Sequence, residues 1–323
     1  MVRSSGESPP TDPPTSPRLG RTATRADAAT APKRQAALGR RPHCVTARLR
    51  IGCSSWTSEA WWGRVYPAEL PPGERLAAYA RRYDAVEVDT SYYRDPGAYL
   101  VRRWARATPD GFAFTLKFPR DLLDPAGPVD REAVASFESH ARELGPKLGA
   151  VVVQFPPWAT PRRTERFLDE LLATVDPAIR YAVELRDAGW YVDPMRGSLL
   201  RRLRDRGCAL VWSYLTYLDV PAEVTADMVY LRFIGDHTTV PADRHGELRV
   251  DRSAETRLWA ARTRSVLDQV ANVFAFFNNH FAGFAPASVN LFRQEMGLEA
   301  VDYAPADPGP APGRARGVVR RLD

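Results

Sequence analysis

Charged side chains stand near the ends of several short apolar runs in this sequence, and their types could support acid–base chemistry. Glu87, Lys117 and Glu184 each lie in a segment where polar and apolar residues alternate. Two carboxylates on opposite walls of one pocket can act as general acid and general base, with pKa values set by neighbouring cations. We therefore predict Glu87, Glu184 and Lys117 as catalytic residues.

A second group of polar and aromatic residues lies near the same strand ends. Arg186 and Arg232 could clamp a carboxylate or a phosphate, because a guanidinium group presents paired donors. Aromatic rings just past a strand could stack on a sugar or a base, although loop packing is the alternative for each ring. The predicted substrate-binding residues are Trp56, Asp89, Tyr93, Gln154, Arg186, Arg232 and Asn278.

The same carboxylates could instead hold a divalent cation together with Asp236, His237 or His280. The five histidines show no H-x-x-x-H or H-x-H spacing, so support for a metal is weak and the cofactor is left open. A further alternative is a self-satisfied ion-pair network without a ligand. Stability alone does not require such a network, since aliphatic side chains often serve as well.

Short β-like runs alternate with helical patterns between residues 47 and 303. Eight strands that alternate with seven or more helices predict an α/β fold of the (β/α)8, TIM-barrel type. A doubly wound sheet is the alternative, but no glycine-rich phosphate turn follows any strand. The predicted strands are Leu49–Cys53, Ala85–Thr90, Phe112–Phe118, Ala150–Phe155, Tyr181–Arg186, Ala209–Ser213, Met228–Ile234 and Asn272–Asn278, and helices are expected at about 74–82, 97–107, 130–145, 161–175, 194–206, 253–270 and 284–297, with no long helix between Ser213 and Met228.

Alternation assigns the side chains of each strand to two faces, since successive residues point in opposite directions. The apolar positions must face the outer helices, which leaves polar positions facing the barrel interior near the carboxyl ends of the strands. Active sites of TIM barrels lie at this end. The residues assigned to the interior are Gly52, Ser54, Glu87, Asp89, Thr115, Lys117, Gln154, Glu184, Arg186, Tyr230 and Arg232.

The positive charge of the chain is concentrated at its two ends. The formal net charge is +6, of which residues 1–46 carry +5 and residues 304–323 carry +2, so residues 47–303 carry −1. Both ends lack hydrophobic periodicity and are rich in Pro and Ala, so we predict disordered tails at 1–46 and 304–323 around one domain at 47–303. A nearly neutral domain disfavours nucleic acid as a partner, although a basic tail could contact it.

Several classes of protein are excluded by composition. Three cysteines, Cys44, Cys53 and Cys208, at wide spacing support neither a disulfide framework nor a sulfur-only metal cage. No stretch approaches 18 apolar residues and the first residues lack the apolar core of a signal peptide. We therefore expect a cytoplasmic protein that does not interact with membranes.

Ordered motifs from about residue 48 to about residue 298 resemble the domain-of-unknown-function 72 (DUF72, YecE-like) family. The segments I-G-C-S-S-W at 51–56, Y-P-A-E-L-P at 66–71 and V-E-V-D-T-S-Y-Y at 86–93 are similar to that family's I-G-T-S-G/S-W, Y-P-x-x-L-P and V-E-I-N-S-T-F-Y. Further matches are F-T-L-K-F-P at 114–119, Q-F-P-P at 154–157, V-E-L-R at 183–186, Y-L-R at 230–232 and F-N-N at 277–279. The resemblance implies a TIM barrel and distant kinship with sugar-isomerase-like and endonuclease-IV-like barrels, but no particular reaction.

Two positions depart from the family pattern. Asp89 stands where the family usually has Asn, and Ile234–Gly235 stands where many members have His-Gly. Asp236 or His237 could replace that histidine.

Three functions are compatible with the sequence. The first is an enzyme that acts on a small polar, sugar-like or anionic substrate at the carboxyl end of the barrel. The second is a metal-dependent nuclease or nucleic-acid-processing barrel, and the third is a non-catalytic ligand-binding module.

Overall fold

Eight parallel strands close into a barrel in which each strand pairs with the next and β8 pairs with β1. The computed structural model describes residues 47–303, so the predictions for the tails at 1–46 and 304–323 concern residues outside the described range. The strands are β1 (Arg48–Cys53), β2 (Ala85–Val88), β3 (Ala113–Lys117), β4 (Leu148–Gln154), β5 (Tyr181–Glu184), β6 (Ala209–Leu215), β7 (Met228–Gly235) and β8 (Asn272–Phe277). The predicted TIM-barrel fold is confirmed.

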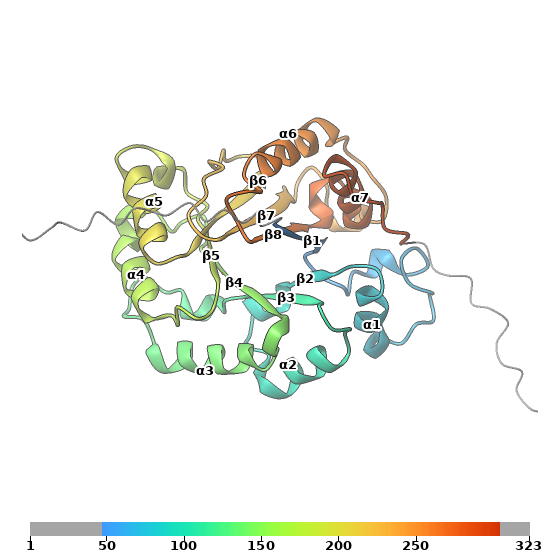
Figure 1. The fold of residues 1–323 in the computed structure, drawn as a ribbon, viewed down its shortest axis with the longest axis horizontal. Coiled ribbons are helices and arrows are strands. Elements are labelled where there is room, and N and C mark those ends of the chain that lie inside the picture. Colours follow the sequence, from blue (N-terminus) through green and yellow to red (C-terminus); the bar gives the residue numbers. More distant parts are fainter. Residues whose placement is uncertain (1–46, 304–323) are drawn as a thin grey trace, which may run out of the picture. The chain divides into compact units, whose positions relative to one another are not determined.

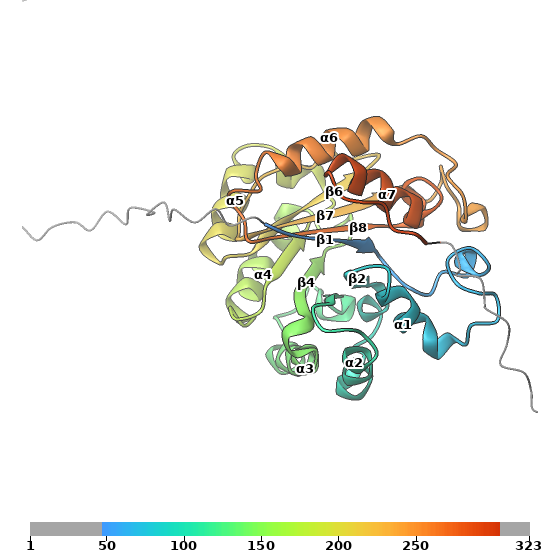
Figure 2. The same cartoon turned by 45° about the vertical axis from the view of Figure 1, so that its right-hand side comes forward.

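The α-helices lie on the outside of the barrel (Figure 1). Within residues 47–303 they are α1 (Arg75–Ala80), α2 (Gly97–Arg106), α3 (Arg131–Arg142), α4 (Pro161–Thr174), α5 (Met195–Asp205), α6 (Ser253–Arg264) and α7 (Ala285–Glu295). As predicted, no helix connects β6 to β7 in this described region. The last helix, α7, packs against β1 and β8, which brings the two ends of the barrel domain together (Figure 2).

Two separate apolar clusters follow from the alternation of side chains along the strands. Outward residues such as Val86, Leu116 and Leu231 pack against the helices and form the larger cluster. Inward residues such as Val152, Tyr230 and Phe276 form a second cluster inside the barrel. The inner cluster contains many alanines, because side chains from eight strands must share a narrow interior.

Gly52 allows β1 and β2 to approach each other closely. A Cβ atom at this position would lie 2.1 Å from the carbonyl oxygen of Ala85 and 2.8 Å from the hydroxyl of Tyr79. That hydroxyl joins the two strands, since it accepts from the backbone N–H of Cys53 and donates to the Ala85 carbonyl. A side chain at position 52 would therefore open the barrel seam at its first pair of strands.

The interior changes from apolar to charged toward the carboxyl ends of the strands. Residues that pair in register on neighbouring parallel strands share a face, and Gln154 pairs with Glu184 while Ser213 pairs with Arg232. All four side chains lie above the inner apolar cluster, at the last inward position of their strand or close to it. The fold therefore collects polar groups from several strands at one end.

Candidate functional site

Arg232, on β7, lies at the centre of a buried network of hydrogen bonds. Its Nε donates to both carboxylate oxygens of Glu87, at 3.1 and 2.9 Å, and its Nη2 donates to Glu87 Oε1 at 2.8 Å. Its Nη1 donates to Gln154 Oε1 at 2.9 Å and to Glu184 Oε2. The guanidinium group thus joins strands β2, β4, β5 and β7. Because Arg232 is only 2% exposed, these contacts are shielded from solvent.

Glu87 is completely buried, and both of its carboxylate oxygens are engaged by the protein. Besides Arg232, it accepts a 2.9 Å hydrogen bond from the hydroxyl of Tyr230, which is itself 2.7 Å from Thr115 Oγ1. Burial and the adjacent carboxylate of Glu87 raise the pKa of Tyr230 well above its usual value. Tyr230 therefore remains a neutral donor that holds Glu87 in place.

Glu184 extends the network toward the solvent through Arg186. The Nε of Arg186 donates to Glu184 Oε1 at 2.9 Å, and the Arg186 side chain is 16% exposed. Burial by itself raises the pKa of Glu184, but the positive charges of Arg186, Arg232 and Lys117 outweigh burial and lower it to about 2. Glu184 is therefore an anion at neutral pH, suited to stabilise positive charge.

Lys117 and Asp89 form a second ion pair at the ends of β3 and β2. The Nζ of Lys117 lies 2.8 Å from Asp89 Oδ1 and 4.2 Å from the centre of the Tyr92 ring. The lysine side chain is 5% exposed, whereas that of Asp89 is 36% exposed. Burial and the positive charge of Arg232 lower the pKa of Lys117, although Asp89 and Glu87 act in the opposite direction.

Ser91 connects the two strand ends that carry this ion pair. Its hydroxyl donates to the Val88 carbonyl at 2.8 Å and accepts from the backbone N–H of Lys117 at 2.8 Å. The hydroxyl therefore ties the end of β2 to the end of β3. Since Asp89 lies in the short 3-10 helix Asp89–Tyr92 that contains Ser91, its carboxylate is positioned by the same contacts.

Uncharged polar groups complete this end of the barrel. The hydroxyls of Ser54 and Ser213 are buried and have no hydrogen-bond partner among residues 47–303. Ser54, Asp89 and Asn278 line a cavity of about 70 Å³. The Asn278 side chain also accepts from the backbone N–H of His280 at 3.0 Å, so it closes the turn after β8 as well as facing the cavity.

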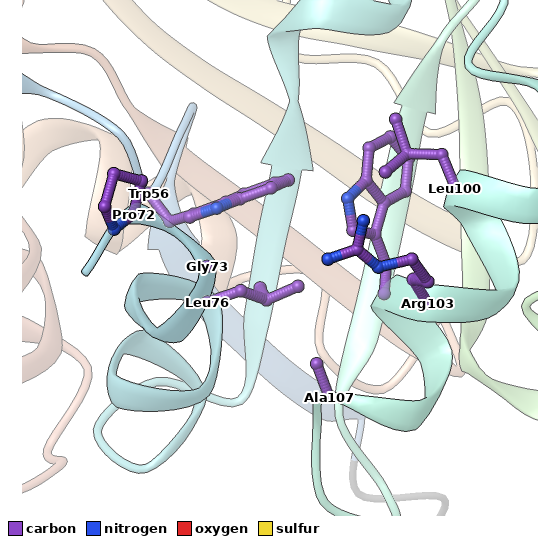
Figure 3. Close-up of a pocket in the computed structure, with 8 residues that line it drawn as sticks. Trp56, Pro72, Gly73, Leu76, Leu100, Arg103 and Ala107 are labelled. Atoms are coloured by element: carbon purple, nitrogen blue, oxygen red, sulfur yellow. The ribbon is translucent and has the colours of Figure 1, made fainter.

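The two predicted aromatic residues lie apart from the ion network. Trp56 packs edge-on against Trp104, with ring centres 5.7 Å apart, and lines a cavity of about 140 Å³ between α1 and α2 (Figure 3). Tyr93 is 59% exposed and its ring lies under the guanidinium of Arg120, at 5.4 Å. Among the aromatic residues that follow a strand, Tyr92 contacts the network, through Lys117.

A group of three histidines lies beyond the ends of β7 and β8. The rings of His237 and His245 are centred 3.9 and 4.5 Å from the ring of His280. The carboxylate of Asp236, the other residue predicted as a possible replacement for the histidine of the family pattern, accepts from the backbone and side chains of Thr238 and Thr239. Within residues 47–303, no group of three or more His, Cys, Asp or Glu side chains could hold a metal ion.

Comparison with known proteins assigns the family. The model of the family described as "Protein of unknown function DUF72" matches residues 50–313. The chain belongs to the DUF72 family.

Two curated relatives match this DUF72 protein over different shares of its length. The UPF0759 protein YunF of Bacillus subtilis (strain 168) is 21% identical over 282 residues, which are 80% of this chain and 98% of YunF. The UPF0759 protein YecE of Escherichia coli (strain K12) is 31% identical over 164 residues, which are 49% of this chain and 56% of YecE. The resemblance to the YecE-like family that the motifs indicated is therefore confirmed.

Two solved structures of DUF72 family proteins share the fold. The protein from Enterococcus faecalis V583 has a TM-score of 0.64 and 21% identity, and the match covers 79% of this chain and all of that one. The protein from Thermotoga maritima MSB8 has a TM-score of 0.62 and 23% identity, with 77% and 99% covered. At this identity the likeness establishes the barrel fold alone.

Sequence reasoning placed most of the network of this DUF72 protein but missed three contributors. Ser91 and Ser213 were not predicted as site residues, and Tyr230 was assigned to the interior without a role. Period-two alternation on β6 places Ser213 on the face of Val211, so the signal for its position was present. No sequence signal identifies Ser91, because its contact with β3 depends on the turn that follows β2.

Proposed function

We propose that this protein is an enzyme that acts on a small polar substrate, sugar-like or anionic, at the carboxyl end of its barrel. The observation that carries the proposal is the set of three acids and three cations gathered there from β2, β3, β5 and β7 or from the residues directly after them. Aliphatic side chains would fill the same space without the cost of removing the four buried charges from water, which belong to Glu87, Lys117, Glu184 and Arg232.

The members of this set differ in how much of their bonding capacity the protein already uses. Glu87 and Arg232 form several hydrogen bonds with each other deep in the barrel. We therefore assign them to positioning the charged groups that lie closer to the solvent. Arg186 and Asp89 are partly exposed, and we assign them to contact with the substrate. The buried hydroxyls of Ser54, just past β1, and Ser213, on β6, have no hydrogen-bond partner in the described part of the chain and add donors and acceptors suited to the hydroxyls of a polar substrate.

Glu184 is the candidate for proton transfer or charge stabilisation, since it lies between the buried Arg232 and the more exposed Arg186. Its low pKa favours the ionised form, which suits the stabilisation of a developing positive charge better than a role as an acid or as a base. We also infer a cytoplasmic, reducing location, which agrees with the free, buried thiols of Cys53 and Cys208. Among the described residues, no helix is long and apolar enough to cross a membrane.

The proposal is tested by incubating the purified protein with a metabolite extract and following every component by mass spectrometry. We expect one polar metabolite to be consumed, with the rate reduced about a hundredfold or more by Glu184→Gln. Glu143→Gln is the matched control, because Glu143 pairs with Arg102 on the surface, away from the barrel end.

Other outcomes separate the alternatives. Retention of a metabolite without its consumption would replace the enzyme by a ligand-binding module. Consumption at the wild-type rate by folded Glu184→Gln would remove Glu184 from catalysis. Binding of nucleic acid that weakens steeply with salt and disappears on deletion of residues 1–46 would favour the nucleic-acid-processing alternative.

A further inference from the structure

Lys117 is chemically unusual in this chain. The sequence contains three lysines and 42 arginines, so nearly all of its cationic positions are arginine. An arginine at position 117 could also form an ion pair with Asp89. A lysine differs from an arginine in one chemical respect that matters here: its amine can lose a proton near neutral pH and then act as a nucleophile, whereas a guanidinium group remains protonated.

We propose that Lys117 forms an imine with the carbonyl carbon of a small aldehyde or ketone. This inference rests on the proposed function and names its substrate class as carbonyl compounds that carry hydroxyl or anionic groups. Three contacts of the Lys117 side chain support it: the carboxylate of Asp89, the face of the Tyr92 ring, and the protein interior that surrounds its methylene groups.

Asp89 is placed to move the proton that the reaction requires. Its Oδ1 lies 2.8 Å from Lys117 Nζ and its side chain is partly exposed. The carboxylate takes one proton from the ammonium group, and the neutral Nζ attacks the carbonyl carbon to form a C–N bond. After proton transfer from nitrogen to oxygen, protonated Asp89 returns its proton to the carbinolamine hydroxyl. The C–O bond then breaks, water leaves, and the nitrogen lone pair forms the C=N bond.

Charge is conserved through this sequence, which suits the surroundings of Lys117. An ammonium group and a ketone give an iminium ion and water, so Nζ carries one positive charge both before the reaction and after it. The face of Tyr92, 4.2 Å from Nζ, and the carboxylate of Asp89 stabilise both the first and the last cation. Burial and the charge of Arg232 lower the pKa of Lys117. A pKa that is lower by one increases the fraction of neutral amine about tenfold at a pH well below the pKa.

Lys147 provides an internal control for the reactivity of lysine. Its Nζ donates to the carbonyl oxygen of Ala105, in the last turn of α2, at 2.6 Å and to that of Thr108, after the end of the helix, at 2.7 Å. Among the described residues, no carboxylate pairs with Lys147, so it lacks the proton acceptor that Asp89 provides for Lys117. The remaining lysine, Lys33, lies outside the described range.

The inference is tested by reductive trapping. The full-length protein is incubated separately with glycolaldehyde, dihydroxyacetone and pyruvate in the presence of sodium cyanoborohydride, which reduces an iminium ion to a stable secondary amine. Peptide mapping by mass spectrometry then locates the adduct. We expect at least one probe to label Lys117 about tenfold faster than Lys147. We expect Lys117→Arg to abolish this label, and its melting temperature shows that the variant is folded.

The result that overturns the inference is labelling of Lys117 by all three probes no faster than labelling of Lys147. Adduct formation at the same total rate in folded Lys117→Arg would overturn it as well. This test is separate from that of the proposed function. If a metabolite is consumed but Lys117 is not labelled, the imine proposal is wrong and the proposed enzyme stands. If Lys117 is labelled but no metabolite is consumed or retained, the result supports the imine and contradicts the proposed enzyme.

Discussion

Replacement of Arg232 by methionine tests whether the charges at the barrel end depend on one another. Methionine has a similar length and fills the same space without a charge. In the variant, Glu87 loses its only cationic hydrogen-bond partner among the described residues, while Glu184 keeps Arg186. The structure therefore predicts that most of the cost comes from Glu87, which is completely buried.

The magnitude follows from the desolvation of the orphaned carboxylate. Removal of one partner of a buried ion pair costs about 3–5 kcal/mol, because the remaining charge is left uncompensated in the interior. For a domain of this size, such a loss lowers the melting temperature by roughly 10 °C.

Thermal and urea denaturation of both proteins at neutral pH provide the measurement. The control is Arg102→Met, which removes a surface ion pair with Glu143 and should cost less than about 1 kcal/mol. Addition of Glu87→Gln to Arg232→Met should recover part of the loss, since an amide carries no charge. A penalty for Arg232→Met that equals that of the control, or that Glu87→Gln does not reduce, would refute the reasoning.

Three further predictions concern individual positions of the barrel. The pKa of Glu184 is about 2 in the folded protein against an ordinary 4.5, so its contribution of up to about 3 kcal/mol to stability is present above about pH 4.5 and is lost toward pH 2. Glu184→Gln should therefore melt at a lower temperature than the wild type at neutral pH but lose less stability on acidification, and parallel pH profiles of the two melting temperatures would contradict this. Gly52→Ala should lower stability by about 1–3 kcal/mol in urea denaturation, because its Cβ would lie 2.1 Å from a backbone oxygen of β2, whereas Gly73→Ala, with nothing within 4 Å, should not. Asp89→Asn should shift the pH midpoint of reductive labelling at Lys117 to lower pH, since Asp89 raises the pKa of that amine; an upward shift would show that Asp89 does not act on it electrostatically.

The sequence predicted the barrel because its signals are local. Alternating apolar residues mark the strands, and the absence of a helical pattern between β6 and β7 matches the structure. Alternation also assigned Glu87, Gln154 and Arg232 to the interior, since a strand has a period of two whatever it packs against. Together with the motifs from 51–56 to 277–279, these patterns were sufficient for the fold and the family.

Which charges pair with one another was decided only by the tertiary structure. Glu87 and Arg232 are 145 positions apart in sequence, and their contact requires the closure and the tilt of the barrel strands. The same closure leaves Trp56 against Trp104 rather than beside the ions, because the loop after β1 turns outward toward α2. Alternation determines the face on which a side chain lies, whereas the partner of a side chain depends on the distances between strands, which no local pattern contains.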